Sequence, residues 1–210
     1  MITINGINAK LETTNPTGSI KDRMAWHILR NAEKRGELKP GSRILEVTSG
    51  NTGIAFSMIS AIRGYKFTAV MPESMSIERR KMMIAFGAEL ILTPAKDDIA
   101  GAVRKYTEIA KLHPEYWLPK QFENPDNIEA NKILGQEIIQ QTDGNVDVFV
   151  AGIGTGGTLI GVAHALKKMN PHVKIIGVEP LESPVLSGGN AGLHKIQGIG
   201  EGFVPKLVQD

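Results

Sequence analysis

Residues 43–53 read Arg-Ile-Leu-Glu-Val-Thr-Ser-Gly-Asn-Thr-Gly, and this stretch decides the fold class. Its first five residues are mostly apolar and predict a buried strand, while the small polar residues and glycines after them predict a turn that leads into a helix. The same order recurs along the chain. Strands are expected at 8–12, 43–47, 66–71, 88–92, 146–151 and 173–178, and helices at about 19–36, 52–62, 76–86, 97–112, 126–141 and 158–169.

This alternation predicts an α/β fold. A strand, a helix and a second strand in succession require a crossover connection, so the sheets are expected to be mostly parallel, with helices on both faces. Residues 113–127 contain Pro114, Pro119 and Pro125 and form the most irregular stretch, which we interpret as the crossing between two lobes.

The composition is that of an ordinary globular protein. The 210 residues include 41% hydrophobic and 22% charged residues and no cysteine, which excludes a disordered chain and a disulfide scaffold. A formal net charge of +2 offers no dense basic face for nucleic acid, and no apolar stretch is long enough to span a membrane. The five histidines are scattered, so no metal site is expected, and the first residues carry no secretory signal, so we expect a cytoplasmic protein.

The first of three polar loops is Asn-Pro-Thr-Gly-Ser-Ile-Lys-Asp-Arg at 15–23. Its proline and glycine predict a turn, and Ser19 with Asp22 matches a capping box that opens a helix. Lys21 would then lie in the first turn, where the positive end of the helix dipole favours a neutral amine that can act as a nucleophile or a base. The alternative is an exposed lysine beside Asp22.

The other two loops each lie between a predicted strand and a predicted helix. Residues 48–53, Thr-Ser-Gly-Asn-Thr-Gly, expose backbone N–H groups at a helix start and suit a carboxylate or a phosphate, although an ordinary capped turn uses the same residue types. Residues 152–158, Gly-Ile-Gly-Thr-Gly-Gly-Thr, carry more glycines than a capped turn needs, so we predict anion binding there. By contrast, residues 78–81, Glu-Arg-Arg-Lys, predict a solvated helix face.

The third loop leaves a second function open. Gly152, Gly154 and Gly157 match Gly-x-Gly-x-x-Gly after a strand, and Glu179 follows at the end of the next strand, near the spacing of an acid that binds a ribose. A dehydrogenase with an NAD-binding, Rossmann-type domain is therefore an alternative. That alternative gives no role to Lys21 or to the loop at 48–53.

Taken together, the loops resemble segments of the cysteine synthase (O-acetylserine sulfhydrylase) family, within the fold type II enzymes that use pyridoxal 5′-phosphate. Residues 15–23 are similar to its Schiff-base segment, 48–53 to its substrate loop and 154–158 to its phosphate-binding loop. Two further stretches, Lys-Gln-Phe-Glu-Asn-Pro at 120–125 and His-Lys-Ile-Gln-Gly-Ile-Gly at 194–200, resemble other family segments. The resemblance runs in order from about residue 10 to about residue 205.

The resemblance implies a reaction and a role for each loop. L-Cysteine would form from O-acetylserine and sulfide, with acetate leaving, and Lys21 would carry the cofactor and act as the base for the substrate's α-proton. Asn51 would hydrogen-bond the cofactor's ring oxygen, and Gln121 would close over the substrate. The implied cofactor-binding residues are Lys21, Asn51, Gly154, Thr155, Gly156, Gly157 and Thr158, and the substrate carboxylate would lie against Thr48, Ser49 and Thr52.

The resemblance also implies an architecture and partners. Residues 15–127 would form a smaller, mobile lobe, and residues 1–14 plus 128–210 an incomplete larger lobe, because the family's Gly-Asn-Thr-Pro-Leu and Ser-Ser-Gly segments have no counterpart here. A homodimer and an association with serine acetyltransferase are implied. The alternatives are a cystathionine β-synthase-like enzyme of the same fold and a non-catalytic fragment of a cysteine synthase, and the segment at 194–200 favours the sulfide-using synthase.

Overall fold

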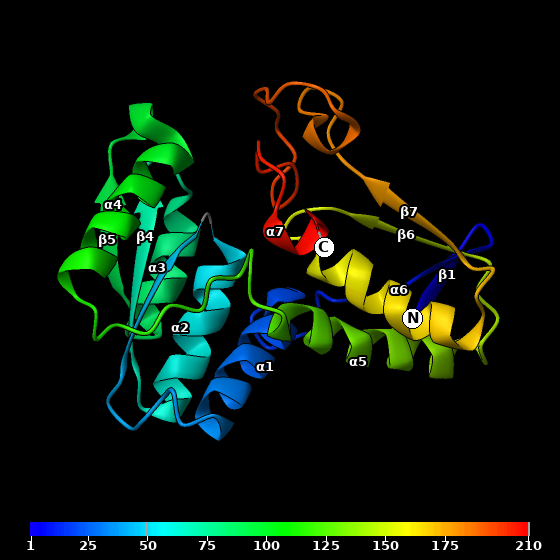
Figure 1. Cartoon of the computed structure of the whole chain (residues 1–210), viewed down its shortest axis with the longest axis horizontal. Coiled ribbons are helices and arrows are strands. Elements are labelled where there is room, and N and C mark those ends of the chain that lie inside the picture. Colours follow the sequence, from blue (N-terminus) through cyan, green and yellow to red (C-terminus); the bar gives the residue numbers. More distant parts are fainter. Residues whose placement is uncertain (49, 210) are drawn as a thin grey trace. The chain divides into compact units, whose positions relative to one another are not determined.

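The computed structural model describes residues 1–48 and 50–209. The chain divides into two compact units (Figure 1). Unit 1 comprises Met1–Leu11 and Gln121–Asp210, and unit 2 comprises Glu12–Lys120. These bounds differ slightly from the lobes inferred from the resemblance, and the mobility of the smaller lobe stays a prediction. No described helix combines the length and the apolar character that crossing a bilayer requires.

Unit 2 is built on a three-stranded parallel sheet. Its strands are β3 (Arg43–Val47), β4 (Lys66–Pro72) and β5 (Glu89–Thr93), in the order β3-β4-β5. In the register, Arg43 lies opposite Lys66 and Thr68 opposite Glu89. The strands predicted at 43–47, 66–71 and 88–92 are confirmed, the last two with ends shifted by one residue. Strands β3 and β4 are mostly apolar and are buried at every position after the first, because helices cover both faces of the sheet there.

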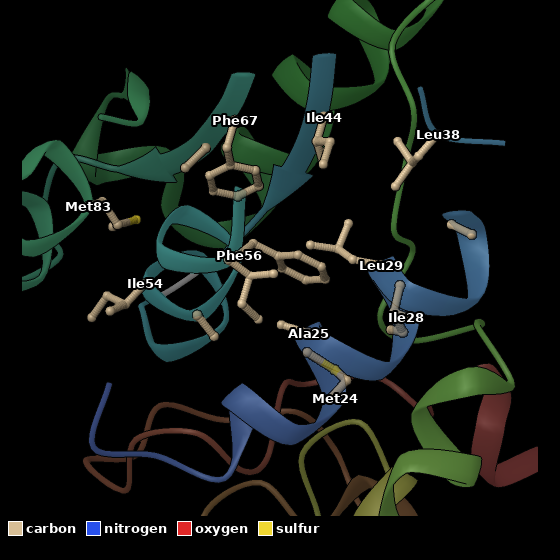
Figure 2. Close-up of a cluster of buried hydrophobic side chains, with 14 of the residues drawn as sticks. Met24, Ala25, Ile28, Leu29, Leu38, Ile44, Ile54, Phe56, Phe67 and Met83 are labelled. Atoms are coloured by element: carbon tan, nitrogen blue, oxygen red, sulfur yellow. The ribbon is translucent and has the colours of Figure 1, made fainter. Parts of the chain in front are cut away.

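Helices cover both faces of this sheet, as predicted for a parallel α/β arrangement. One face packs against α1 (Lys21–Lys34), α2 (Asn51–Arg63) and α3 (Ile77–Ala85). Figure 2 shows this core, in which Phe56 of α2 stacks on Phe67 of β4 with ring centroids 5.9 Å apart. The opposite face packs against α4 (Asp98–Leu112), which follows the short 3-10 helix η1 (Ala95–Asp97).

Unit 1 begins with a hairpin that the sequence analysis did not predict. Strands β1 (Ile2–Ile4) and β2 (Ile7–Ala9) pair antiparallel, with Ile4 opposite Ile7. Both turn residues have positive φ, 49° at Asn5 and 79° at Gly6, which the two-residue turn of a tight hairpin requires. The strand expected at 8–12 is therefore wrong in its bounds, because the chain leaves the pairing after Ala9.

The rest of unit 1 places two helices beside a parallel pair of strands. Strands β6 (Val148–Gly152) and β7 (Lys174–Val178) pair with each other, and α6 (Gly157–Met169) packs on them. Helix α5 (Asp126–Gln141) packs along α6, and the 3-10 helix η2 (Val185–Ser187) and α7 (Lys206–Gln209) follow β7. The helices predicted at 126–141 and 158–169 are confirmed.

One feature of this sheet differs from the prediction of helices on both faces. In the described part of unit 1, alternate residues of the two strands remain between 44% and 55% exposed: Val148, Val150, Ile176 and Val178. Their neighbours Phe149 and Ile175 are partly buried, because they point to the face on which α6 packs.

Glycines bring α5 and α6 unusually close together. A Cβ atom on Gly135 of α5 would lie 2.6 Å from Ala165 Cβ, and one on Gly161 of α6 would overlap the carbonyl oxygen of Ile128. At these points the helix backbones take the space that a side chain would need. The start of α5 is therefore held tightly beside the start of α6.

Candidate active site

The loop before α1 places Lys21 at the first residue of that helix, with a half-buried side chain. The predicted capping box is wrong. The Ser19 hydroxyl accepts from the backbone N–H of Lys21 at 3.3 Å, not from that of Asp22, and the helix has Ile20 at its N-cap without a side-chain cap. The buried Asp22 carboxylate instead turns back to Thr17, accepting its backbone N–H at 2.7 Å and its hydroxyl.

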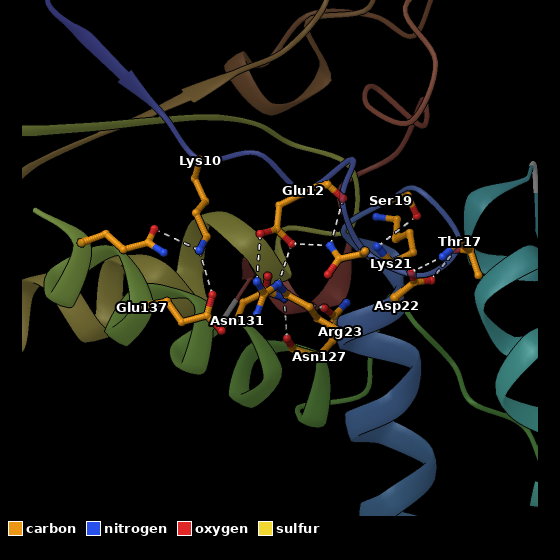
Figure 3. A network of polar contacts seen from close by, with 12 residues as sticks. Lys10, Glu12, Thr17, Ser19, Lys21, Asp22, Arg23, Asn127, Asn131 and Glu137 are labelled. Carbon is orange, nitrogen blue, oxygen red and sulfur yellow. Dashed lines mark hydrogen bonds and ion pairs between the residues drawn. The ribbon is translucent and has the colours of Figure 1, made fainter. Parts of the chain in front are cut away.

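An ion pair braces the same loop from its other end (Figure 3). Arg23 Nε lies 2.5 Å from Glu12 Oε2, and Arg23 Nη2 lies 3.0 Å from Glu12 Oε1, so the pair is bidentate. Asn15 Nδ2 donates to Glu12 Oε2 at 2.7 Å and to its carbonyl oxygen at 2.9 Å. The turn before Lys21 is thus held on one side by the bonds of Glu12 and on the other by those of Asp22.

The second loop connects β3 to α2 and is organised by Thr48. Its buried Oγ1 accepts the backbone N–H of Gly50 at 3.1 Å and that of Gly53 at 3.0 Å. Two accepted bonds use both lone pairs of a hydroxyl, so the O–H proton of Thr48 is left to donate. Asn51 is the exposed first residue of α2, and Thr52 is buried behind it. Ser49, also predicted to bind substrate, lies outside the described residues.

Arg79 of α3 is a neighbour of this loop that the sequence analysis missed. Residues 78–81 were predicted to be a solvated helix face, but Arg79 is half-buried and lies against the backbone of Gly50. A Cβ atom on Gly50 would be 2.5 Å from Arg79 Cδ and 2.7 Å from Arg79 Nε. Within unit 2, α1 and α2 pack side by side, and Figure 1 shows both running in the same direction, so their starts lie at the same end.

The third loop lies in unit 1, between β6 and α6, and its glycines are required by close packing. Gly156, the N-cap of α6, has a φ of 86°, and the Thr155 hydroxyl before it accepts the N–H of Gly157, the first residue of the helix, at 3.3 Å. A Cβ on Gly154 would lie 2.5 Å from the carbonyl oxygen of Gly198, and one on Gly157 would overlap the side chain of Asn127. The first N–H groups of a helix have no partner within it, so this loop presents backbone donors that suit an anion.

Asn127, in the first turn of α5, is a second residue that the sequence analysis missed. It is buried, and its Nδ2 donates to Thr155 Oγ1 at 3.0 Å and to the carbonyl oxygen of Gln121 at 2.9 Å. It therefore joins two segments that were predicted separately, the substrate-covering Gln121 and the anion loop. A signal was present in the sequence, because Asn127 and Asn131 share the face of α5 that carries Ala130 and Leu134.

Glu179 does not support the dinucleotide alternative. Its carboxylate accepts the backbone N–H of Leu186 at 2.8 Å and that of Ser187 at 2.9 Å, and it also accepts the Ser187 hydroxyl. The hydroxyl bond lowers the pKa of Glu179 below its usual value. The carboxylate thus holds η2 against the end of β7. Its oxygens are engaged in these local hydrogen bonds, which argues against the predicted role in binding a ribose.

The comparisons identify the class of protein. The family model of the pyridoxal-phosphate dependent enzymes matches residues 2–209, and the chain belongs to this family. A cysteine synthase from a Flavobacterium species is 50% identical over 200 residues, covering 95% of this chain and 65% of the relative.

Solved structures give the same picture. A cysteine synthase from Entamoeba histolytica has a TM-score of 0.92 at 49% identity, over 94% of this chain and 59% of that one. An O-acetylserine-dependent cystathionine β-synthase from Helicobacter pylori has a TM-score of 0.88 at 44% identity, over 94% and 64%. The predicted α/β fold of the fold type II enzymes is confirmed. The chain spans slightly less than two thirds of the length of these relatives.

Each unit by itself carries residues that suit one part of the family's cofactor, a phosphate ester that also carries an aldehyde. Unit 1 offers a glycine loop at the start of a helix, in which a side chain on Gly154 or Gly157 has no room. Unit 2 offers the amine of Lys21 at the start of α1 and the amide of Asn51 at the start of α2.

Proposed function

We propose that this chain carries out the pyridoxal-phosphate-dependent formation of L-cysteine from O-acetylserine and sulfide. The observation that carries the proposal is the placement of Lys21, the one lysine of the braced segment 12–23, half-buried at the first residue of α1. An amine at a helix start, held by a loop whose other polar groups are bonded among themselves, is suited to form a covalent bond with an aldehyde and then to transfer a proton.

The residues of unit 2 bind the reacting end of the ligands. Lys21 Nζ would hold the cofactor through its aldehyde group and, when its amine is free, would act as the base for the proton on the substrate α-carbon. Asn51 donates a hydrogen bond to the ring oxygen of the cofactor. Thr48 donates its O–H proton to the substrate carboxylate, since both of its lone pairs are already used, and Ser49 and Thr52 contact the same carboxylate.

The residues of unit 1 hold the phosphate and cover the substrate. The hydroxyls of Thr155 and Thr158 would donate to the phosphate oxygens, together with the backbone N–H groups of residues 154–158 other than that of Gly157, which donates to Thr155 Oγ1. Gln121, whose side chain is buried, closes over the substrate. When bound, the cofactor supplies an electron sink that allows acetate to leave from the β-carbon. Sulfide adds at that carbon, and Lys21 returns the proton to the α-carbon.

The other expectations from the resemblance are part of the same proposal. A homodimer, an association with serine acetyltransferase and a cytoplasmic location are supported by likeness to the cysteine synthases alone. Size-exclusion chromatography with light scattering, with and without an acetyltransferase, tests the two assemblies.

A second candidate differs only in the sulfur nucleophile. The O-acetylserine-dependent cystathionine β-synthase from Helicobacter pylori is 44% identical to this chain, so a thiol in place of sulfide is the alternative acceptor. Supplying O-acetylserine with either sulfide or homocysteine, and identifying the product by mass, distinguishes the two. A chain that yields only the thioether product contradicts the cysteine assignment.

The experiment that tests the core of the proposal is a spectrum and a peptide map. The purified chain is mixed with pyridoxal 5′-phosphate, its visible absorption is recorded, and the complex is reduced with borohydride and digested. We expect a pyridoxyl group on the peptide that contains Lys21 and loss of the visible band in Lys21→Ala. Lys34→Ala, in the last turn of the same helix, is the matched control and keeps the band. An unchanged band in Lys21→Ala would end the assignment.

A further inference from the structure

We infer that Asn127 is a positioning residue, whose side-chain amide makes the Thr155 hydroxyl an obligate donor to the anion held at the start of α6. The inference rests on the proposed function only in identifying that anion as the cofactor phosphate. Asn127 lies on α5, outside the glycine loop itself.

The geometry begins with the surroundings of Thr155 Oγ1. This buried oxygen accepts a hydrogen bond from Asn127 Nδ2 at 3.0 Å and another from the backbone N–H of Gly157 at 3.3 Å. A threonine hydroxyl has two lone pairs and one proton. Because both lone pairs are engaged, the Thr155 hydroxyl can only donate its proton. An anion bound in the loop would accept that proton.

The orientation of the Asn127 amide is itself determined. Its Nδ2 also donates to the carbonyl oxygen of Gln121 at 2.9 Å, and its Oδ1 accepts from Asn131 Nδ2 at 3.2 Å. In the opposite amide orientation, Asn127 Oδ1 would face the carbonyl oxygen of Gln121. A carbonyl oxygen can only accept a hydrogen bond, so that orientation would place two acceptors against each other. The amide group is therefore fixed with its N–H bonds toward Gln121 and Thr155.

The same side chain explains why residue 157 is a glycine. A Cβ atom there would overlap Asn127 Oδ1 and lie 2.9 Å from Asn127 Nδ2. The carboxamide thus occupies the space beside the first residue of α6, and through Gln121 it also holds the segment that precedes α5. A single buried side chain ties the anion loop to the segment proposed to cover the substrate.

The decisive variant is Asn127→Asp, which has the same shape but an acceptor where the amide donates. The new carboxylate would accept the Thr155 proton and withdraw it from the anion. Because a hydrogen bond to a charged group is lost, we expect the dissociation constant for pyridoxal 5′-phosphate to rise on the order of 10- to 100-fold. Asn170→Asp is the matched control, since Asn170 lies in a turn after α6 where its Oδ1 accepts from the His172 N–H. It should change the constant less than about twofold.

A double-mutant cycle separates positioning from general loss of packing. In a Thr155→Val background, which has no hydroxyl to orient, Asn127→Asp should weaken cofactor binding less than about threefold further. In a Thr155→Ser background, which keeps the hydroxyl, the full effect should return. Thermal unfolding of every variant is measured alongside, and 31P NMR of the bound phosphate reports the change in donors directly.

The outcomes distinguish this inference from the proposed function. Equal losses from Asn127→Asp in the wild-type and Thr155→Val backgrounds, or unchanged affinity, would overturn the role of Asn127. A chain that binds inorganic phosphate with the expected dependence on Asn127 but forms no bond at Lys21 would overturn the proposed chemistry alone. A chain that binds neither phosphate nor cofactor would overturn both.

Discussion

The guanidinium arm of Arg79 lies against the Cα atom of Gly50, where a side chain would otherwise stand: a Cβ built on Gly50 would be 2.5 Å from Arg79 Cδ and 2.9 Å from Arg79 Cζ. An alanine at residue 50 would therefore have to displace the far end of the Arg79 side chain, which is flexible. Thr48 holds the loop by accepting hydrogen bonds from two of the loop's backbone N–H groups. Arg79 contacts the loop at the Cα atom of Gly50.

Substituting Gly50 should displace Arg79. We expect Gly50→Ala to reduce the free energy of unfolding by about 0.5–1.5 kcal/mol, the cost of pushing the Arg79 side chain away from its preferred rotamer. In an Arg79→Ala background the cost should be smaller, because the space is open. Urea denaturation of the single and double variants measures the coupling. Arg80→Ala removes the same charge from the adjacent residue and should leave the cost of Gly50→Ala unchanged. If Arg79→Ala and Arg80→Ala reduced that cost equally, the charge and not the contact would be responsible.

The Glu12–Arg23 pair should contribute more than an exposed ion pair of the same kind. Its two side chains are 13% and 20% exposed, against 56% and 40% for Glu108 and Lys105. We expect Glu12→Gln to lower the free energy of unfolding by about 1–3 kcal/mol, because the half-buried guanidinium loses its charged acceptor. Glu108→Gln should cost less than about 0.5 kcal/mol. Similar shifts in the urea midpoint of the two variants would refute the difference.

Gly154→Ala should disturb the anion loop. Its Cβ would lie 2.5 Å from the backbone oxygen of Gly198, which cannot move without moving its segment. We expect cofactor affinity to fall by about 10-fold or more, together with a stability loss of about 1–3 kcal/mol. Gly188→Ala is the control, because Gly188 has a φ of 85° and open space where a Cβ would stand. This variant should lose about 1 kcal/mol of stability through its backbone conformation and keep its cofactor affinity unchanged. Equal affinities would contradict the packing explanation.

Tyr65 should titrate at a higher pH than an ordinary tyrosine. Burial of its ring and the hydrogen bond from its hydroxyl to Glu33 Oε1, at 2.8 Å, raise its pKa to about 12 from the ordinary value of 10.0. Since the pKa is raised by folding, this contribution to stability is complete below pH 10.0 and is lost as the pH rises through about 12.

Absorbance at alkaline pH, compared between the wild type and Tyr65→Phe, isolates this titration. Glu33→Gln should shift the pKa of Tyr65 part of the way back toward its ordinary value, because the negative charge beside the phenol is removed. A pKa near 10.0 in the wild type would contradict the packing of this ring.

Much of the fold was predictable, since its main elements depend on local patterns. The buried strands β3 and β4 are short apolar runs, and α5 and α6 repeat apolar residues at helical spacing, so their bounds follow from neighbouring residues alone. The hairpin at Ile2–Ala9 was missed because its three-residue strands leave their isoleucines exposed and show no burial pattern. The predicted capping box is wrong because the Asp22 carboxylate accepts the backbone N–H of Thr17, within the turn.

The order of the loops along the chain, with a lysine at one helix start and glycines at another, is written in the amino-acid sequence, because turns and helix starts depend on residues next to each other. Only the folded chain decided which side chains support those loops. Arg79 lies on a different helix from Gly50, and Asn127 is 28 residues from Thr155. Hydrogen bonds and close contacts of buried groups are satisfied by whatever packing brings near, and no local pattern encodes that proximity.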